Sequence, residues 1–486
     1  MPDVVAESAE AFDRRHRRRW DATEKLMFSL HDDMTRIAAQ EAYEVSLLEL
    51  RLNRFHVPEK LSTIQRFEKR TAPKKKGKQW TLFDSIWEPR TRWCDSLDFY
   101  DTDEAELKGF EADWQRALAC GIGKYIGRLD DEEAGAVDED GMDEVEEVEK
   151  VLWQFHDLIY VCFDYYAALG SSDDFTHMQL NSFTQFVADC HLSSNKSKFC
   201  KKTHFDQLFI AVDASGAGGK TDEAFNKKKA LNRQEWLQTL VKIACMRYLQ
   251  SGEIVDVSEA VHRLFSADIE PKLDTRVFCE GNEFRSKFMY AEGVDKAFRK
   301  YEKSLRLIYE KLTRLKGQNA ALGLANQMVN IDVWKEFCQM FNLGGNDLTD
   351  RHITLAFVWS RMKVIDEQST KMRVKLTHLT FEDWIEALTR LAAYKVFPTD
   401  EELAESEHPC VGVYLRTMKD EDPEEFEILI NTRSRPWGAE PKMRIERCVE
   451  HLCNLLVVTG QGGKGDNMEL TEKEATKFMK VAAAVV

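Results

Sequence analysis

Residues 205–240 read FDQLFIAVDASGAGGKTDEAFNKKKALNRQEWLQTL, and they share a pattern of apolar residues with VWSRMKVIDEQSTKMRVKLTHLTFEDWIEAL at residues 358–388. In each stretch a run with helical spacing ends on an aspartate, Asp213 or Asp366. A polar gap follows, and then a second run with helical spacing contains a tryptophan, Trp236 or Trp384. Apolar residues three and four apart are typical of amphipathic helices. Each stretch therefore predicts a helix, a loop and a second helix.

The pattern resembles the hydrophobic skeleton of an EF-hand. In that family apolar residues precede loop position 1, a branched residue occupies position 8, and an aromatic residue follows position 12. The loops here are longer than the EF-hand loop. Leu231 comes eighteen positions after Asp213, and Leu379 comes thirteen after Asp366, whereas position 8 follows position 1 by seven. Neither loop is expected to close in the standard way.

The calcium ligands of these loops are also incomplete. Position 5 after Asp213 is Ala217, where an oxygen ligand is needed. Glu235 stands where the last ligand would be in the first loop, but the second loop offers only the shorter Asp383. We expect both units to pack as helix–loop–helix units that do not bind calcium. The alternative is a calcium-responsive regulator that uses Asp213 and Glu235.

A partner unit is expected for each of these two, because EF-hands work in pairs. Met178, Phe183 and Phe186 repeat the spacing of the second helix after a first helix around Phe155 to Tyr166. Val329, Trp334 and Phe337 do the same after Tyr301 to Leu315. The chain is therefore predicted to be mainly α, with two EF-hand-like helical modules whose loops are degenerate.

Proline placement suggests where these modules begin and end. Four of the ten prolines lie in residues 1–89 and five in 398–441, so only Pro271 interrupts the interval between. The expected parts are an N-terminal helix and basic, aromatic arm (1–100), an acidic linker or helix (101–150), a first EF-hand-like pair (151–270), a second pair (271–397) and a C-terminal helical region (398–486). Within them, residues 7–54 have the composition of one long helix, and residues 129–150 hold twelve acidic side chains against one lysine.

Composition excludes several classes of protein. The 68 basic and 84 acidic residues leave a net charge of −16, which argues against a nucleic-acid binder. Eleven cysteines without a CxxC pair fit reduced thiols in the cytosol. No apolar run is long enough to cross a bilayer, and no signal peptide is recognised at the amino terminus. We expect a soluble, cytoplasmic protein.

Two motifs suggest ligands. Residues 214–221 read ASGAGGKT, which satisfies a permissive phosphate-loop pattern, so a nucleotide-dependent enzyme using Lys220 and Thr221 is a second alternative. A phosphate loop follows a buried strand, however, and the residues before this motif have helical spacing. Four residues, Cys190, His191, Cys200 and His204, are possible zinc ligands, but only Cys200 and His204 approximate the close pairs of a structural zinc site.

Catalytic motifs are missing as well. The chain has no HExxH cluster, no GxSxG elbow and no cysteine nucleophile signature. We therefore predict no catalytic residues, no cofactor, no metal and no enzyme activity.

Positive charge and tryptophan are concentrated near the amino terminus. A chain this acidic that gathers its positive charge at one end is expected to dock to an anionic surface. Aromatic residues on a segment without helical or strand periodicity are candidate anchors into a partner. The predicted partner-binding residues are Arg14, Arg15, Arg17, Arg18, Arg19, Lys74, Lys75, Lys76, Lys78, Trp80, Trp87 and Trp93.

Two helix–loop–helix pairs between charged extensions resemble a loosely defined group of flagella-associated proteins of algae and other protists. The residues that carry this likeness are 205–213 with 231–240, and 358–366 with 379–391. The resemblance implies a structural component of the ciliary or flagellar axoneme, bound to tubulin of the microtubule doublet and to other axonemal proteins in a large complex. Paired helix–loop–helix units also present grooves for a partner helix, so we expect constitutive clamps without a calcium trigger.

Overall fold

The structure is a computed structural model of the 486-residue chain, and it describes residues 79–131, 143–170, 174–216, 225–278, 281–315, 327–436, 439–463, 465 and 469–482. The chain divides into two compact units, Met1–Gln79 and Trp80–Val486. Only residue 79 of the first unit is described, so every element below belongs to the second. The expected helix over residues 7–54 lies outside the described residues. So do the two basic clusters, the arginines at 14–19 and the lysines at 74–78.

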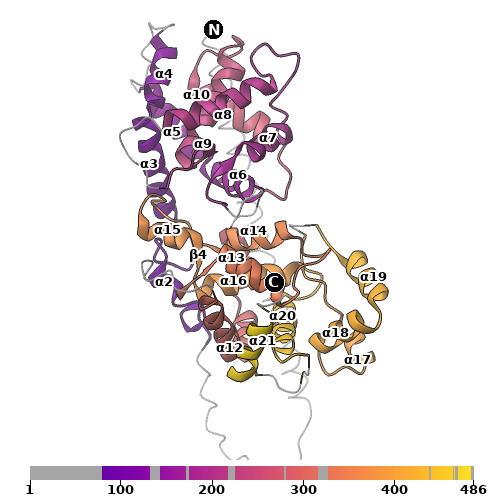
Figure 1. Ribbon diagram of the computed structural model, residues 1–486. Coiled ribbons are helices and arrows are strands. Elements are labelled where there is room, and N and C mark those ends of the chain that lie inside the picture. Colours follow the sequence, from indigo (N-terminus) through magenta and orange to yellow (C-terminus); the bar gives the residue numbers. More distant parts are fainter. Residues whose placement is uncertain are drawn as a thin grey trace, which may run out of the picture. The chain divides into compact units, whose positions relative to one another are not determined.

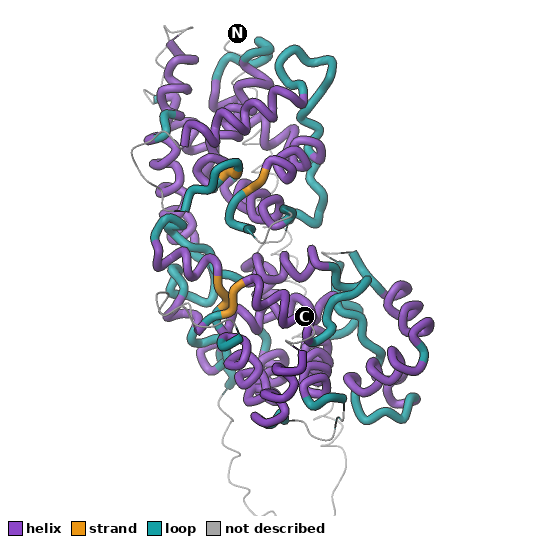
Figure 2. The backbone as a smooth tube through the Cα atoms, in the orientation of Figure 1, coloured by secondary structure: helices purple, strands orange, loops and turns teal. Residues whose placement is uncertain are grey.

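The predicted class is confirmed: the described part of the chain is mainly helical (Figure 1). Its strands are four segments of two residues each, which form two antiparallel pairs. Figure 2 shows these short pairs in orange among the helices. Helices therefore build almost all of the core.

The first helix–loop–helix pair is joined by one of these small sheets. Its elements are α6 (His156–Ala168), β1 (Met178–Gln179), α7 (Leu180–Asp189), α8 (Lys202–Gly216), β2 (Ala230–Leu231) and α9 (Arg233–Ala244). Met178 lies opposite Leu231 in the sheet. The indole of Trp236 on α9 is buried and donates a hydrogen bond of 3.1 Å to the carbonyl of Ile159 on α6. The sheet and the tryptophan fasten the two units together.

The second pair repeats the arrangement with one extra helix. Its elements are α12 (Glu292–Thr313), β3 (Val329–Asn330), α13 (Ile331–Met340), α14 (Asp350–Ser360), α15 (Thr370–Thr377), β4 (His378–Leu379) and α16 (Phe381–Tyr394). Val329 lies opposite Leu379. Trp334 on α13 donates 2.8 Å to the carbonyl of Ile353 on α14. The two pairs thus share one order of elements, and their membership of the EF-hand family stays a prediction.

Capping residues explain where the second helices begin. Asn232 and Glu235 form a reciprocal capping box at the start of α9, and Thr380 and Asp383 form one at the start of α16. The side chain of Asn330 accepts from the amide of Val333 at the start of α13. Each box satisfies amide groups that the first helical turn leaves without partners. The acidic residues that the sequence offers as last calcium ligands therefore act as helix caps.

Both aspartates that were expected to end a helix are placed differently. Asp213 lies inside α8, which continues to Gly216. In the second stretch α14 ends at Ser360, six positions before Asp366, because the backbone of Arg361 is extended at φ −74° and ψ 150°. The segment 361–369 and α15 then fill the interval before β4. The prediction of a helix running to Asp366 is wrong.

The region read as an arm and an acidic linker is also helical and packed. Its elements are η2 (Leu82–Asp84), α2 (Arg90–Trp93), α3 (Asp103–Ala119), α4 (Ile122–Asp131) and α5 (Glu144–Gln154). Phe110 and Trp114 on α3 are buried, and α3 packs on α9. The described parts of 101–150 therefore belong to the core, and although many of their acidic residues are exposed, Asp101 and Asp113 are buried.

Between the pairs the chain forms short α-helices and π-helical turns. These are η3 (Cys245–Leu249), α10 (Val257–Arg263), η4 (Leu264–Ile269), α11 (Gly281–Phe284) and η5 (Arg285–Met289). Helix α10 packs against α5 and α9, and η5 packs against α16. Elements before Pro271 thus pack with the first pair, and η5 packs with the second.

The C-terminal region is helical, as predicted, and it covers the second pair. It comprises α17 (Asp400–Glu405), α18 (Val411–Glu421), α19 (Pro423–Arg433), α20 (Ile445–Gly460) and α21 (Glu472–Ala482). Helix α20 packs against α12, α16 and α18, and all fourteen residues of α16 are buried. The chain's own helix therefore occupies a face that a partner helix would need.

Two further expectations concern the cysteines and membrane-spanning helices. The ten cysteines that the structure describes are all free thiols. Among the described helices, none is both long and apolar enough to span a membrane.

Candidate functional site

The carboxylates of the first predicted calcium loop are bound by groups of the chain itself. Asp213 Oδ1 accepts a hydrogen bond of 2.9 Å from the amide of Lys229. Glu235 is fully buried, and its Oε2 accepts 3.0 Å from the amide of Asn232. Its other oxygen accepts 3.4 Å from the side-chain amide of Asn226. These oxygens, which would have to bind a calcium ion, thus accept hydrogen bonds from groups of the protein.

The carboxylates of the second loop are paired with arginines from outside the second pair. Asp366 Oδ1 lies 2.6 Å from Arg116 Nη2 on α3. Asp383 Oδ1 lies 2.9 Å from Arg90 Nη2 on α2, and its Oδ2 accepts from the amide of Thr380. The arginines supply the positive charge that a metal ion would supply in a calcium loop. This loop is held by ion pairs within the chain.

The arginine on α2 belongs to a larger buried ion cluster centred on Glu386 of α16. Glu386 is fully buried and is bound by three arginines: Arg90 at 2.7 Å, Arg285 at 3.0 Å and Arg390 at 2.6 Å. Arg285 also binds Asp101 at 2.7 Å. With Asp383, three carboxylates balance three guanidinium groups. The cluster joins α2, Asp101 just ahead of α3, η5 and α16.

The electrostatics of this cluster favour the charged form of Glu386. Burial alone would raise the pKa of its carboxyl, but Arg285, Arg90 and Arg390 lower it, and the pKa ends at about 2. Burial opposes the charge of Arg285, yet Glu386 and Asp101 raise the pKa of that guanidinium further above its usual range. Glu386 and Arg285 therefore carry their charges at neutral pH, and each depends on the opposite charge of the other.

A second polar centre surrounds a cavity of about 60 Å³ where the two pairs meet. Its walls come from α3, α6, α9, α15 and the segments around residues 175 and 361–367. The polar lining residues are Glu106, Tyr160, Asp164, Thr176, Arg233, Arg361, Lys363 and Glu367. A space of this size has room for ordered water molecules.

Arg361 is buried beside this cavity without a close carboxylate. Its Nε and Nη1 donate to the carbonyls of Val358 and Leu376 at 2.9 and 2.6 Å. Asp164 lies 3.8 Å from Nη2. Burial lowers the pKa of Arg361 to about 10, with Asp164 opposing the shift. The group remains a cation at neutral pH and fixes the chain where α14 ends.

Arg233 and Glu367 connect the pairs across the same cavity. Arg233 Nη2 lies 2.7 Å from Asp113, and its Nη1 donates 3.3 Å to the carbonyl of Val364. Glu367 Oε1 accepts 3.4 Å from the amide of Arg233, while Oε2 has no hydrogen-bond donor in the described part of the chain. Burial raises the pKa of Glu367, and Arg233 opposes that rise. The junction is a polar cross-link between α9 and the loop before α15.

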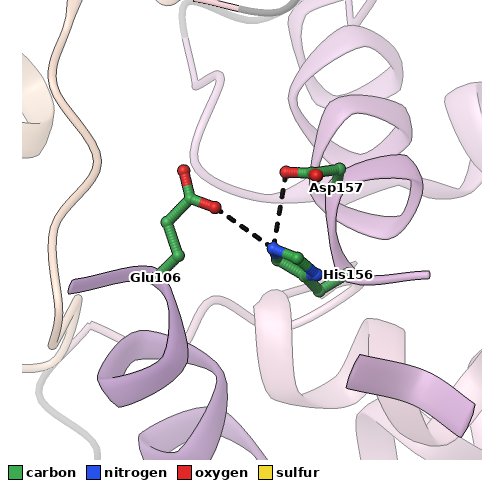
Figure 3. Close-up of side chains that lie close together, drawn as sticks. All are labelled: Glu106, His156 and Asp157. Carbon is green, nitrogen blue, oxygen red and sulfur yellow. Dashed lines mark hydrogen bonds and ion pairs between the residues drawn. The ribbon is translucent and has the colours of Figure 1, made fainter. Parts of the chain in front are cut away.

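Figure 3 shows a carboxylate–histidine group at the rim of this cavity: Glu106, His156 and Asp157, whose ligand atoms lie within 4.8 Å of one another. His156 Nε2 is 3.1 Å from Glu106 and 3.5 Å from Asp157. Lys363 Nζ lies 2.6 Å from Glu106 and 3.4 Å from Asp157. A metal ion would have to displace this ammonium group, so the geometry favours an ion-pair cluster over a metal centre.

The two hydrogen-bond partners of the imidazole in this cluster favour its charged form. Its Nδ1 is 2.7 Å from the carbonyl of Trp153, and its ring stacks on that indole with centroids 3.9 Å apart. A carbonyl and an ionised carboxylate can only accept, so both ring nitrogens carry hydrogen. Burial lowers the pKa of His156, but Glu106 and Asp157 raise it, and the net shift is upward.

Replacing Glu106 by glutamine is expected to lower the pKa of His156, because the hydrogen-bonding carboxylate is the main cause that raises it. The measurement is an NMR titration of the His156 ring. The raised pKa means that the protonated ring stabilises the folded state below pH 6.5, and that this contribution is lost as the pH rises through the folded value. Glu104→Gln, on the exposed face of α3, is the control. An unchanged His156 pKa in Glu106→Gln would contradict the assignment.

A second acidic group joins α5 to α10. The ligand atoms of Glu144, Glu147 and Asp256 also lie within 4.8 Å of one another. Burial and Asp256 raise the pKa of Glu144 to about 8, and the amide of Ser258 donates 2.7 Å to Glu144. Burial and the neighbouring Asp256 thus favour the neutral form of the Glu144 carboxyl. Among the described residues these two groups are the ones with metal-like spacing, and neither contains the four cysteines and histidines considered for zinc.

The remaining predicted residues fall into two sets. Arg14, Arg15, Arg17, Arg18, Arg19, Lys74, Lys75, Lys76 and Lys78 lie outside the described residues, as do Lys220 and Thr221 of the phosphate-loop pattern. The run Leu208 to Val212 before that pattern is part of α8, as its spacing predicted, and is not the strand that a phosphate loop requires.

The three tryptophans of the predicted arm are bound within the chain. Trp87 is fully buried and lies edge-on to Tyr290 and Phe298, with centroids 5.4 and 6.4 Å away. Trp80 Nε1 donates 3.0 Å to Asp295, and Lys375 Nζ lies 5.5 Å from the ring centre of Trp93. Trp87 therefore has a core within the chain, which is built by Phe298 of α12 and by Tyr290, the residue after η5.

The cluster around Glu386 was not found from the sequence. A signal was present: Asp383, Glu386 and Arg390 follow at intervals of three and four in a helix whose other residues are mostly apolar. That spacing places the three charges on one face. Their partners Arg90 and Arg285 lie far away in sequence and gave no local indication.

Comparison of the chain with protein-family models, with curated proteins and with solved structures finds no match.

Proposed function

We propose that the protein is a non-enzymatic scaffold of a cytoskeletal assembly, the ciliary or flagellar axoneme. In this proposal a body of fixed shape attaches to microtubule doublets or to a complex bound on them. One observation carries the proposal: the carboxylates of both predicted calcium loops are bound by the chain's own amides and arginines. A body held in this way keeps its shape without an ion or a substrate, which a permanent structural component requires.

The ion cluster around Glu386 supports the same proposal. Arg90, Arg285 and Glu386 are buried, and they hold together segments that are up to 296 residues apart in sequence. Breaking such contacts is costly, because each charge left behind is buried without a counter-charge. The body therefore resists rearrangement when load or partners act on it.

The attachment surface in this proposal differs from the clamps expected from the sequence. Helix α20 covers α12 and α16, and α3 and α10 pack on α9. These faces are filled by the chain and are not open to a partner helix. We assign attachment to the basic clusters of the N-terminal unit. Their positive charge is complementary to the acidic exterior of tubulin.

Cosedimentation with microtubules tests this attachment. Replacing Lys74, Lys75, Lys76 and Lys78 by glutamine, or the five arginines at 14, 15, 17, 18 and 19, is expected to weaken binding by about tenfold at low salt. The salt dependence should flatten as well, because fewer charges take part. The matched control removes four exposed lysines from the folded body, Lys296, Lys473, Lys477 and Lys480, and should bind as the unchanged protein does.

Two outcomes would overturn the proposal. Equal binding by the cluster variants and the control would remove its electrostatic basis. A change in microtubule binding on adding micromolar calcium would instead favour a calcium-responsive regulator, and calorimetry with Asp213→Ala would then locate the ion.

A further inference from the structure

The C-terminal helices line an open cavity with a largely apolar wall, which is separate from the ion cluster around Glu386 and from the cavity between the two pairs. Its volume is about 390 Å³, within the range of about 300–1,000 Å³ that small-molecule pockets occupy. Its wall is formed by α13, α18, α19, α20 and α21 and by residues just after α13, α16 and α20. The apolar lining residues are Met340, Phe341, Val396, Leu415, Phe426, Ile430, Leu455 and Phe478.

The wall of this cavity is built from well-packed elements. Phe341 and Phe478 lie with ring centres 4.8 Å apart, and Leu415 and Ile430 are buried. Helix α18 approaches α20 closely at Gly412, where a Cβ atom would lie 2.8 Å from the Cβ of Val458. The amide of Gly412 also donates 3.0 Å to Asn454 of α20. The cavity is therefore a stable feature of the packing between these helices.

Positive charge gathers on the α18 side of the cavity. Arg416 and Lys419 are exposed residues that line it, together with one acid, Asp420, which lies 3.6 Å from Arg416 Nε. Arg416 packs over the turn at Gly463, which has a positive φ of 90° and no side chain to obstruct it. Lys395 also lines the cavity but is paired with Asp347 at 3.0 Å. The rim thus carries one positive charge in excess.

We propose that this cavity binds an aliphatic carboxylate, with its chain against the eight apolar side chains and its carboxylate at Arg416 and Lys419. A concave space of this size fits a small molecule, whereas a partner helix would need an extended groove. The apolar wall selects a hydrocarbon chain, and the one positive charge in excess at the rim selects an anionic head over a neutral or cationic one. This inference is independent of microtubule attachment.

Isothermal titration calorimetry of the full chain with sodium decanoate below its micellar concentration tests the proposal. We expect saturable binding of one molecule. Octanoate should bind more weakly, by about fourfold for each methylene removed, because each buried methylene contributes a fixed transfer free energy. Decanol and decyltrimethylammonium, with the same chain but without the negative head, should bind at least tenfold more weakly than decanoate.

The variant Arg416→Gln/Lys419→Gln tests how much the head group of the ligand contributes to binding, apart from its hydrocarbon chain. Both side chains are exposed, so the fold is expected to remain, and decanoate should bind about tenfold more weakly while decanol binding stays unchanged. The matched control, Lys473→Gln/Lys477→Gln, removes two charges from α21 outside the cavity. No binding of decanoate, equal binding of the three decyl compounds, or equal loss in variant and control would each overturn the proposal.

Discussion

Replacing Glu386 by glutamine lowers the free energy of unfolding by about 3–5 kcal/mol, the usual cost of breaking a buried ion pair from one side. The expected loss is large because Arg90, Arg285 and Arg390 all bind this carboxylate in a buried site. An amide of nearly the same shape keeps the packing but removes the negative charge. Urea unfolding followed by circular dichroism measures the change from the midpoint and slope.

Glu302→Gln is the matched control for this prediction. Glu302 also binds an arginine, Arg306 at 2.8 Å, but the pair is on the surface of α12. Exposed pairs contribute roughly 0–1 kcal/mol, so this variant should be nearly as stable as the unchanged protein. A similar small loss in both variants would show that Glu386 is not the centre of a buried cluster.

The same cluster predicts that the stability of the folded protein depends on pH in the acidic range. The folded pKa of Glu386, about 2, lies below its ordinary value of 4.5. Its contribution to stability is therefore complete above pH 4.5 and is lost as the pH falls from 4.5 towards 2. Over that interval the unchanged protein should lose stability more steeply than Glu386→Gln.

Replacing Leu456 by alanine on α20 is expected to cost about 2–5 kcal/mol. Leu456 is fully buried, and it lies on one face with Leu452 and Val449 at helical spacing. Because α20 packs against α12, α16 and α18, removing this side chain leaves a void in the core of the second pair. Urea unfolding again gives the difference in free energy.

The neighbouring residue supplies the control on the same helix. Leu455 is only partly buried and lines the C-terminal cavity, so Leu455→Ala enlarges an existing space and should cost about 1 kcal/mol. Equal and small losses at both positions would mean that α20 rests loosely on the second pair. A large loss of unfolding free energy in Leu456→Ala alone would support the role of α20 as the helix that completes the second pair.

The helical class and the order of the helices could be predicted because both rest on local spacing. Trp236 with Leu240, and Trp384 with Leu388, lie on second helices as the pattern indicated. The two weaker units, at Met178 and at Val329, also have a first and a second helix in the expected places. The periodicity of apolar residues within ten to fifteen positions indicates a helix, and it does not depend on contacts with the rest of the chain.

The buried ion cluster and the covering helices could not be predicted, because they depend on contacts between distant residues. Arg90 lies in a segment without periodicity, and its partner Glu386 is 296 positions away. Helix α14 ends at Ser360 because Arg361 is fixed by the carbonyls of Val358 and Leu376, a tertiary contact that overrides a continuing apolar pattern. The attachment of Trp87 to Tyr290 and Phe298 is likewise invisible in the sequence around it.

The pairing of Arg90 with Glu386 has a consequence for biosynthesis. A ribosome releases Trp87 and Arg90 long before it has made Glu386, so for most of translation both side chains meet water or chaperones. Domains generally fold as units once all their parts have emerged. Nascent chains interrupted before residue 290 therefore leave the Trp87 indole and the Arg90 guanidinium without the side chains that bury them in the finished protein.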